Sequence, residues 1–225
     1  MYNSATNAVA LSTEAHFRKR AAGRLLTMPG DSVYDPRSGR AVGRSDWDLD
    51  PELAADLAVM EPARPAAVLV PIVRRDALTV LLTQRTETLS KHPGQISFPG
   101  GRVDPDDSGP VETALREAEE EIGLQREHVE VLGFLDGYRT GTGFAITPVV
   151  GLVRPDFMLT LHEGEVADAF EVPLAFLLDA RNHQKASREW RGRQRTFWAM
   201  PFESRYIWGA TAGIVRNLHD RLLAE

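Results

Sequence analysis

Three glutamates near the middle of the chain have a spacing that suits a metal ion. Glu117, Glu120 and Glu121 stand in the stretch REAEEEIGL, and residues related as i, i+3 and i+4 share one face of an α-helix. Like charges at these spacings repel one another. A hard cation such as Mg²⁺ or Mn²⁺ prefers oxygen ligands and would offset that repulsion. The alternative is that these glutamates form an acidic face in contact with solvent, as glutamate-rich helices usually do.

A helix over residues 111–122 is predicted to carry these carboxylates. Its other side is apolar and is expected to dock onto a sheet through Val111, Leu115, Ala118 and Ile122. Gly123 can supply the left-handed residue that ends the helix. Just upstream, Gly100 and Gly101 would bring backbone carbonyls close to the acidic face. One face of the helix is therefore expected in the core and the other in the candidate metal site.

Short β-branched and apolar runs, bounded by Gly, Pro and Asp, predict the strands of one mixed sheet. These runs are AAVLVPIV, ALTVLLTQ, VEVLGFL, ITPVVGLV and DAFEVPL. Two further helical patterns occur, one near EAHFRKRAAGRLL and one in GATAGIVRNLHDRLLAE at the C-terminus. A turn-rich stretch follows the first of them, over residues 29–51.

The overall composition is that of a globular protein. The chain has 225 residues, of which 43% are hydrophobic and 26% charged, and such proportions allow a sizeable core. We expect an N-terminal extension over residues 1–62 and one main domain over 63–225. The net charge of -6 disfavours a nucleic-acid binder, which relies on basic surface. The chain contains no cysteine, so thiolate metal sites and thiol catalysis are excluded.

No membrane partner is expected. The apolar run over residues 65–73 is far shorter than the roughly 20 residues that span a bilayer. At the N-terminus the positive charges follow a weak apolar stretch, which is the wrong order for a secretory signal. A cytoplasmic location is therefore predicted.

The acidic helix resembles the end of the Nudix box, the signature of the Nudix hydrolase superfamily. REAEEEIGL is similar to REUxEExGU, where U is a bulky aliphatic residue, although Ala118 is small for its place. The matching positions are Arg116, Glu117, Glu120, Glu121, Gly123 and Leu124. The general pattern Gx5Ex7R is one residue shorter, and Ser108 stands at its early glutamate. Asp107 is expected to replace that glutamate by bracing the loop against the helix.

A second stretch, LLTQRTETLSKHPGQISFPGG at residues 81–101, resembles the signature of the coenzyme A pyrophosphatase branch. The matching positions are Leu81, Leu82, Thr83, Arg85, Gly94 and residues 98–101. Thr86 stands where the branch prefers Ser or Ala. Ser90 stands where it prefers arginine, and Lys91 beside it could substitute as a point charge. Without a ligand, the same stretch would be a strand, a loop and a strand.

The resemblance covers residues 65–225 and implies a Nudix-type α/β/α sandwich, in which a mixed β-sheet lies between helices. It implies metal-dependent hydrolysis of coenzyme A to 3′,5′-ADP and 4′-phosphopantetheine. Carboxylates around a cation can activate water and neutralise diphosphate oxygens. The implied substrate-binding residues are Arg85, Lys91, Gly94, Phe98, Gly100 and Gly101. Other basic residues suited to the 3′-phosphate lie outside the signature, namely Arg74, Arg75 and Arg139.

The same resemblance assigns roles to the charged residues. Glu117, Glu120 and Glu121 would hold Mg²⁺ or Mn²⁺, while Arg116 would hold a neighbouring carboxylate in place. Glu165, in the acidic loop of LHEGEVADAFEVPL, would be a further metal ligand or the group that activates water. The alternative for Glu165 is an acidic loop that faces solvent.

Two other functions stay open. The Ser90 departure keeps another Nudix substrate in view, such as NADH, ADP-ribose or a nucleoside triphosphate. A non-catalytic Nudix-fold ligand sensor is less consistent with the sequence, because a binding module has no need of three mutually repelling carboxylates. In each case the expected partner is a small-molecule nucleotide, and a homodimer is compatible with the sequence.

Overall fold

The computed structural model describes residues 8–29, 34–35, 40–41, 44–53, 63–88, 93–190 and 192–223. The predictions for Ser90 and Lys91 fall outside the described residues. Within them, no helix is long and apolar enough to cross a membrane.

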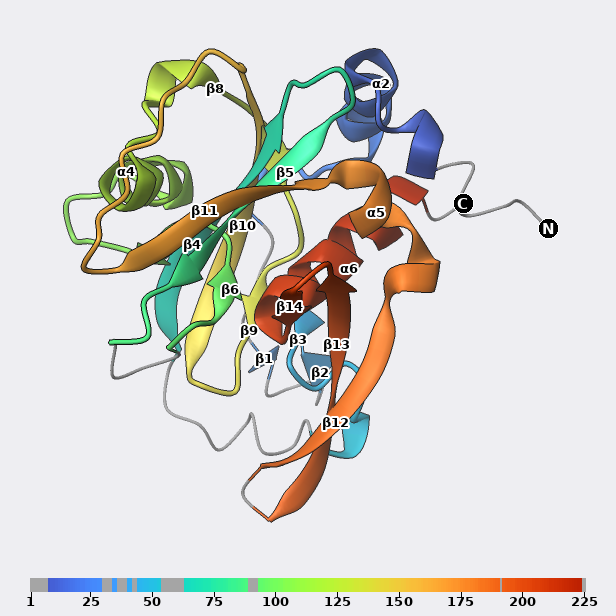
Figure 1. The fold of residues 1–225 in the computed structure, drawn as a ribbon. Coiled ribbons are helices and arrows are strands. Elements are labelled where there is room, and N and C mark those ends of the chain that lie inside the picture. The colour runs from blue at the N-terminus through green and yellow to red at the C-terminus, as the bar shows by residue number, and fades with distance from the viewer. Residues whose placement is uncertain are drawn as a thin grey trace.

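The centre of the fold is a mixed β-sheet (Figure 1). Its strands run in the order β11 (Val166–Pro173), β5 (Thr79–Arg85), β4 (Arg64–Val73), β10 (Phe144–Val153), β9 (Tyr138–Arg139) and β3 (Arg44–Ser45). Strands β4 and β10 are parallel over their whole length, whereas β5 is antiparallel to both β4 and β11. β8 (Val129–Phe134) pairs with β10. The five strands predicted from the sequence are all present.

The sheet opens between β4 and β5, and this opening places the glycine pair. The two strands pair only where Ile72 and Val73 face Val80 and Thr79. Beyond that point, β6 (Ile96–Ser97) pairs with β5, and β7 (Gly100–Arg102) pairs with β4. The segment that contains Gly100 and Gly101 is therefore held in the sheet from both sides.

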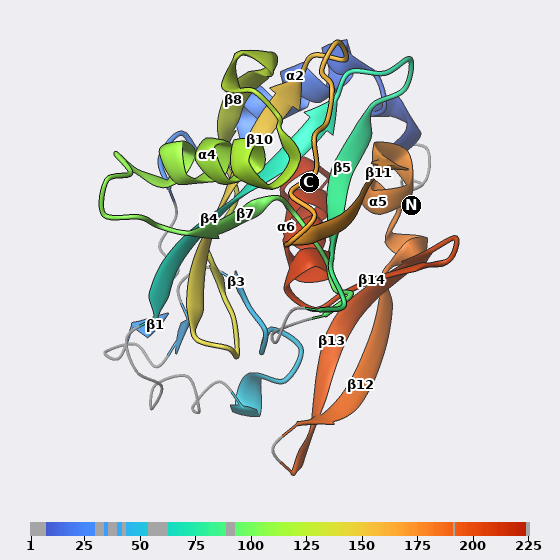
Figure 2. The ribbon, with the colours of Figure 1, turned by 60° about the vertical axis from the view of Figure 1, so that its left-hand side comes forward.

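Helices cover both faces of the sheet, as the resemblance implied (Figures 1 and 2). On one face α4 (Pro110–Ile122) packs over β4 and β10, and its core includes Leu69 and Val149. On the other face lie α6 (Ala210–Leu223), α5 (Leu174–Leu178) and α2 (Glu14–Arg24). The fold class is therefore the predicted α/β/α sandwich.

The N-terminal segment shares the core of the main domain. Phe17 and Ala21 of α2 are buried in the same cluster as the α6 side chains. Further along, β3 extends the central sheet, and Trp47 is fully buried. The remaining elements of this segment are β1 (Tyr34–Asp35), β2 (Arg40–Ala41) and a short 3₁₀ turn, Pro51–Leu53.

A separate three-stranded sheet follows α5 and was not predicted from the sequence. It consists of β12 (Gln184–Trp190), β13 (Arg193–Phe202) and β14 (Arg205–Trp208), all antiparallel. The β12–β13 hairpin projects from the body of the molecule (Figure 2). Short 3₁₀ turns, Arg126–His128 and Ala180–Asn182, complete the described elements.

Candidate active site

Helix α4 presents its carboxylates to the glycine pair because both of its ends are locally fixed. Pro110 occupies the first turn, where its missing N–H costs no hydrogen bond. Gly123 ends the helix with φ 71°, the left-handed conformation expected of it. Ala114 and Ala118 are completely buried, and their small side chains let the helix lie close to the sheet.

The expected division of α4 into a core face and a carboxylate face needs one correction. Val111 and Leu115 are only partly buried, at the rim of the core. Glu121, by contrast, is only 5% exposed. The helix is rotated so that the alanine side faces the sheet, and Glu121 enters the interior with it.

Glu121 is a buried carboxylate with one backbone partner. It accepts a hydrogen bond of 3.1 Å from the N–H of Gly100. Burial raises the pKa of Glu121 to about 7, and the negative charges of Glu117 and Glu165 act in the same direction. The Gly100 N–H and the nearby Arg85 charge lower the pKa of Glu121 but do not cancel the effect of burial. A bound cation would favour the ionised form.

Glu117 lies directly against Gly101. A Cβ at position 101 would lie less than 3.0 Å from the Glu117 carboxylate, so any larger residue here would displace that carboxylate. Burial also raises the pKa of Glu117, while Arg116 lowers it. Arg116 Nη1 lies 3.0 Å from Glu117 and 2.9 Å from Glu120. The Glu120 side chain is 60% exposed, so the three glutamates occupy three different environments.

Asp107 braces the loop against α4 in the way expected of it. Arg116 donates from Nε to Asp107 Oδ1 over 2.9 Å and from Nη2 to Oδ2 over 3.0 Å. Thr113 Oγ1 and the Asp104 N–H also donate to Asp107, over 2.7 and 2.8 Å. The Arg116 guanidinium holds the pKa of Asp107 well below its usual range. Arg116 is thereby fixed where it can orient Glu117 and Glu120.

Glu165 belongs to the same electrostatic cluster. Its charge raises the pKa of both Glu117 and Glu121, although it comes from a loop distant in sequence. The Glu165 side chain is 48% exposed and lies 3.8 Å from His162 Nδ1. The structure thus brings together four carboxylates that the sequence analysis had singled out.

Arg85 ends β5, near Glu121. In the part of the chain that the structure describes, its guanidinium has no hydrogen-bond or ion-pair partner. Its charge nevertheless reaches Glu121. An arginine next to acidic groups that forms no ion pair with them keeps its donors for an anionic ligand.

Three other signature residues, Phe98, Gly94 and Gly100, have surroundings that the structure defines. Phe98 is 3% exposed and packs in the core on the α6 side of the sheet, and its contact with substrate stays a prediction. Gly94 has φ 65°, in the left-handed region. Gly100 lies so close to the backbone of β4 that a Cβ would meet Ala67 and Val68. These residues shape the chain around the site.

The carboxylates suit a hard cation by their chemistry. As the side chains lie, however, no three Asp, Glu or His residues in the described ranges converge on one point. Glu120 forms an ion pair with Arg116, and Glu121 accepts a hydrogen bond from the Gly100 N–H. The unfavourable charge among Glu117, Glu121 and Glu165 is the observation that fits a bound cation.

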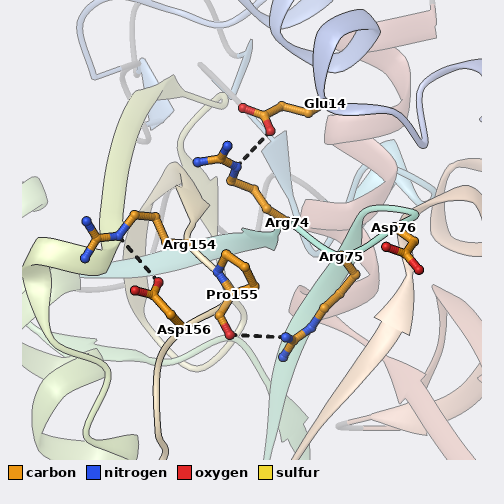
Figure 3. Close-up of a pocket in the computed structure, with 7 residues that line it drawn as sticks. All are labelled: Glu14, Arg74, Arg75, Asp76, Arg154, Pro155 and Asp156. Atoms are coloured by element: carbon orange, nitrogen blue, oxygen red, sulfur yellow. Dashed lines mark hydrogen bonds and ion pairs between the residues drawn. The ribbon is translucent and has the colours of Figure 1, made fainter.

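A cavity of about 630 Å³ lies elsewhere, beyond the last residues of β4 and β10 (Figure 3). It is lined by Glu14, Arg74, Arg75, Asp76, Arg154, Pro155 and Asp156. Arg74 pairs with Glu14 and Arg75 with Glu171. Neither arginine faces the carboxylate cluster, because Gly100 and Gly101 pair with the opposite half of β4. Arg139, the other basic candidate, is buried in β9.

Comparisons with known proteins show which proteins this chain is similar to. A family model described as NUDIX domain matches residues 63–191. An uncharacterized Nudix hydrolase, NudL, from Enterobacter sp. (strain 638) is 41% identical over 170 residues, which cover 76% of this chain and 87% of that protein. NudL from Escherichia coli (strain K12) is 45% identical over 155 residues, covering 69% of this chain and 81% of that protein.

Among solved structures, the NUDIX domain of Shewanella oneidensis NrtR, complexed with ADP ribose, is similar to this chain. It is 20% identical with a TM-score of 0.47, and the match covers 77% of this chain and 98% of that chain.

The chain therefore belongs to the NUDIX family. Membership supports a hydrolase that acts on a nucleoside diphosphate derivative. Nudix hydrolases generally use divalent metal ions.

Sequence reasoning missed three backbone features of the site. These are the Gly100 N–H that binds Glu121, the helix-end carbonyls that hold the loop before β11, and the Thr86 N–H that binds the Glu165 carbonyl. No side-chain signal marks such contacts. The sequence signal for them is glycine at positions 100 and 123, because a residue without a side chain allows another chain segment to approach closely.

Proposed function

We propose that this protein hydrolyses the diphosphate of coenzyme A, or of an acylated or oxidised derivative, with Mg²⁺ or Mn²⁺. Water attacks one phosphorus, the P–O–P bridge breaks, and the products are 3′,5′-ADP and the corresponding 4′-phosphopantetheine. The proposal rests on the resemblance of residues 81–101 to the coenzyme A pyrophosphatase signature. The single structural observation that carries it is Arg85, which lies near Glu121 and has no side-chain hydrogen bond or ion pair with any residue that the structure describes.

In this proposal the carboxylates and Arg85 have separate roles: the carboxylates bind the metal ion, and Arg85 binds the diphosphate. Glu117, Glu120 and Glu121 would hold the metal, which supplies Lewis-acid polarisation of the diphosphate when bound. Arg116 keeps Glu117 and Glu120 oriented and is itself held by Asp107. Arg85 offers donors to the diphosphate oxygens. Glu165 is the candidate to accept the proton of the attacking water or to bind a further metal ion.

A substrate panel tests this function directly. Coenzyme A, acetyl-coenzyme A, NADH, ADP-ribose and nucleoside triphosphates are incubated with Mg²⁺ or Mn²⁺, and the products are separated by chromatography. We expect the highest kcat/KM for a coenzyme A species, because contacts beyond the diphosphate add binding that the other substrates lack. If coenzyme A is not cleaved but ADP-ribose or a nucleotide is, the assignment to the coenzyme A pyrophosphatase branch is wrong. Hydrolysis of a diphosphate by a Nudix enzyme would still hold.

The alternative substrates are NADH, ADP-ribose and nucleoside triphosphates. They stay candidates because Ser90 stands where the coenzyme A pyrophosphatase signature has an arginine. Replacing Ser90→Arg restores the arginine of the branch signature and should lower KM for coenzyme A. One charge-assisted hydrogen bond contributes roughly 1.5–3 kcal/mol when well aligned and less when exposed. ADP-ribose lacks both the 3′-phosphate and the pantetheine arm, so its KM should hardly change. An equal change for both substrates would mean that position 90 shapes the loop without reading the ligand.

A further inference from the structure

The loop that carries Glu165 is docked on the end of helix α4. The Thr160 N–H donates to the Ile122 carbonyl and the His162 N–H donates to the Glu121 carbonyl, each over 2.9 Å. Carbonyls in the last turn of a helix have no partner within the helix. The loop therefore satisfies two groups that would otherwise be open, directly behind the candidate metal ligand Glu121.

The far end of this loop is tied to β5. The Thr86 N–H donates to the Glu165 carbonyl over 3.0 Å, and β11 begins at the next residue, Val166, which pairs with Arg85. A tight turn closes between these anchors, since the N–H groups of Glu165 and Val166 both donate to the His162 carbonyl over 2.9 Å. The Glu165 backbone is thus fixed between the end of α4 and the end of β5.

Gly123 makes the docking of this loop sterically feasible. With φ 71°, it turns the chain away from α4 immediately under the loop. A Cβ at position 123 would lie 3.0 Å from Thr160 N, 3.2 Å from Thr160 Cβ and 3.3 Å from Thr160 O. Two of these neighbours are main-chain atoms, so the loop backbone itself would have to shift by a few tenths of an ångström to admit a side chain.

We propose that Gly123 is a positioning residue, which fixes Glu165 in the carboxylate cluster by allowing residues 157–165 to dock on the end of α4. The inference rests on the proposed function in one respect, namely that Glu165 acts in the reaction. The docking itself stands on the contacts of Thr160, His162 and Thr86. Leu159 and Leu161 add to it by packing against the core on the α4 side.

The test compares two glycines with similar backbone conformations. Gly123→Ala adds a methyl group against Thr160, whereas Gly192→Ala adds one at φ 77°, where no atom of the described residues lies within 4 Å. Both variants bear the cost of a left-handed alanine, so their difference reports the loop contact. We expect Gly123→Ala to lower kcat by about 10–100-fold, the scale of a misplaced catalytic group. KM should hardly change, and Gly192→Ala should keep wild-type kinetics.

A double-mutant cycle with Glu165→Gln shows whether the effect passes through Glu165. If Gly123 acts by placing Glu165, adding Gly123→Ala to Glu165→Gln should lower kcat by less than about twofold. A full additional loss would overturn the proposal, because Gly123 would then act through α4 alone. If Gly123→Ala does not fold, Gly123→Asn and Gly192→Asn replace the pair, since asparagine tolerates the left-handed region.

Hydrogen exchange gives a readout that does not depend on activity. In the full-length protein, Gly123→Ala should speed exchange of the Thr160 and His162 amides relative to Gly192→Ala. Unchanged exchange at both amides would overturn the docking argument. If no diphosphate is hydrolysed by the wild type, the proposed function fails, and the exchange result still decides whether Gly123 holds the loop.

Discussion

The buried carboxylate of Glu121 should make the metal-free protein less stable as the pH rises. The pKa of Glu121 is raised from 4.5 to about 7, chiefly by burial. A carboxyl group whose pKa is raised on folding stabilises the folded state while it is protonated. That stability is complete below pH 4.5, falls as the pH rises from 4.5 to about 7, and is absent above this range.

Glu121→Gln removes this dependence and keeps the hydrogen bond, because the glutamine carbonyl can still accept from the Gly100 N–H. At 1.36 kcal/mol for each pH unit, the wild type should lose roughly 2–3 kcal/mol relative to the variant between pH 5 and pH 8. For a chain of this length that corresponds to a fall in Tm, relative to the variant, of roughly 5–10 °C. Because Glu121 is only 5% exposed, solvent screening reduces the effect little.

The assay is urea unfolding of both proteins in EDTA at pH 5, 6, 7 and 8. The quantity of interest is the difference in free energy of unfolding between wild type and variant at each pH, which cancels the other titrating groups. Glu127→Gln, at an exposed position, is the matched control and should give a flat difference. Saturating Mn²⁺ should stabilise the wild type at pH 8 more than Glu121→Gln. Parallel pH profiles for wild type and Glu121→Gln would refute the reasoning.

Three further predictions concern turnover. Asp107→Asn should lower kcat by about 10–100-fold, the usual cost of losing a residue that orients a metal ligand. The control Asp106→Asn, at an exposed position, should leave kcat unchanged. Equal kcat values for the two variants would mean that the contact of Asp107 with Arg116 does not matter for turnover. Glu120→Gln should reduce turnover by orders of magnitude without lowering Tm, since that side chain is 60% exposed; near wild-type turnover would exclude Glu120 as a ligand. Arg85→Lys should raise KM by about 10–100-fold through loss of bidentate donation, and an unchanged KM would remove Arg85 from substrate binding.

Local patterns in the sequence were sufficient to predict helix α4, its carboxylates and its glycine end. Apolar periodicity and a glycine that can adopt the left-handed conformation are properties of residues close together in sequence, so a short stretch carries them. Five strands of the central sheet, β4, β5, β8, β10 and β11, were predicted for the same reason, whereas the short strands β3, β6, β7 and β9 were not. β12 was missed because its residues are mostly exposed and polar, and an exposed strand lacks the apolar alternation that marks a half-buried one.

The tertiary structure alone decided how the charged residues differ from one another. Glu120 and Glu121 are neighbours with the same side chain, yet Glu120 lies in solvent beside Arg116 and Glu121 lies against the sheet. That difference arises from the rotation of α4 on β4, which depends on packing between residues distant in sequence. Glu165 joined the cluster because the loop before β11 docks on the end of α4. The residue type determines the charge and hydrogen-bonding capacity of a side chain. Its burial and its distance from other charges, which set its pKa, are determined only when the chain folds.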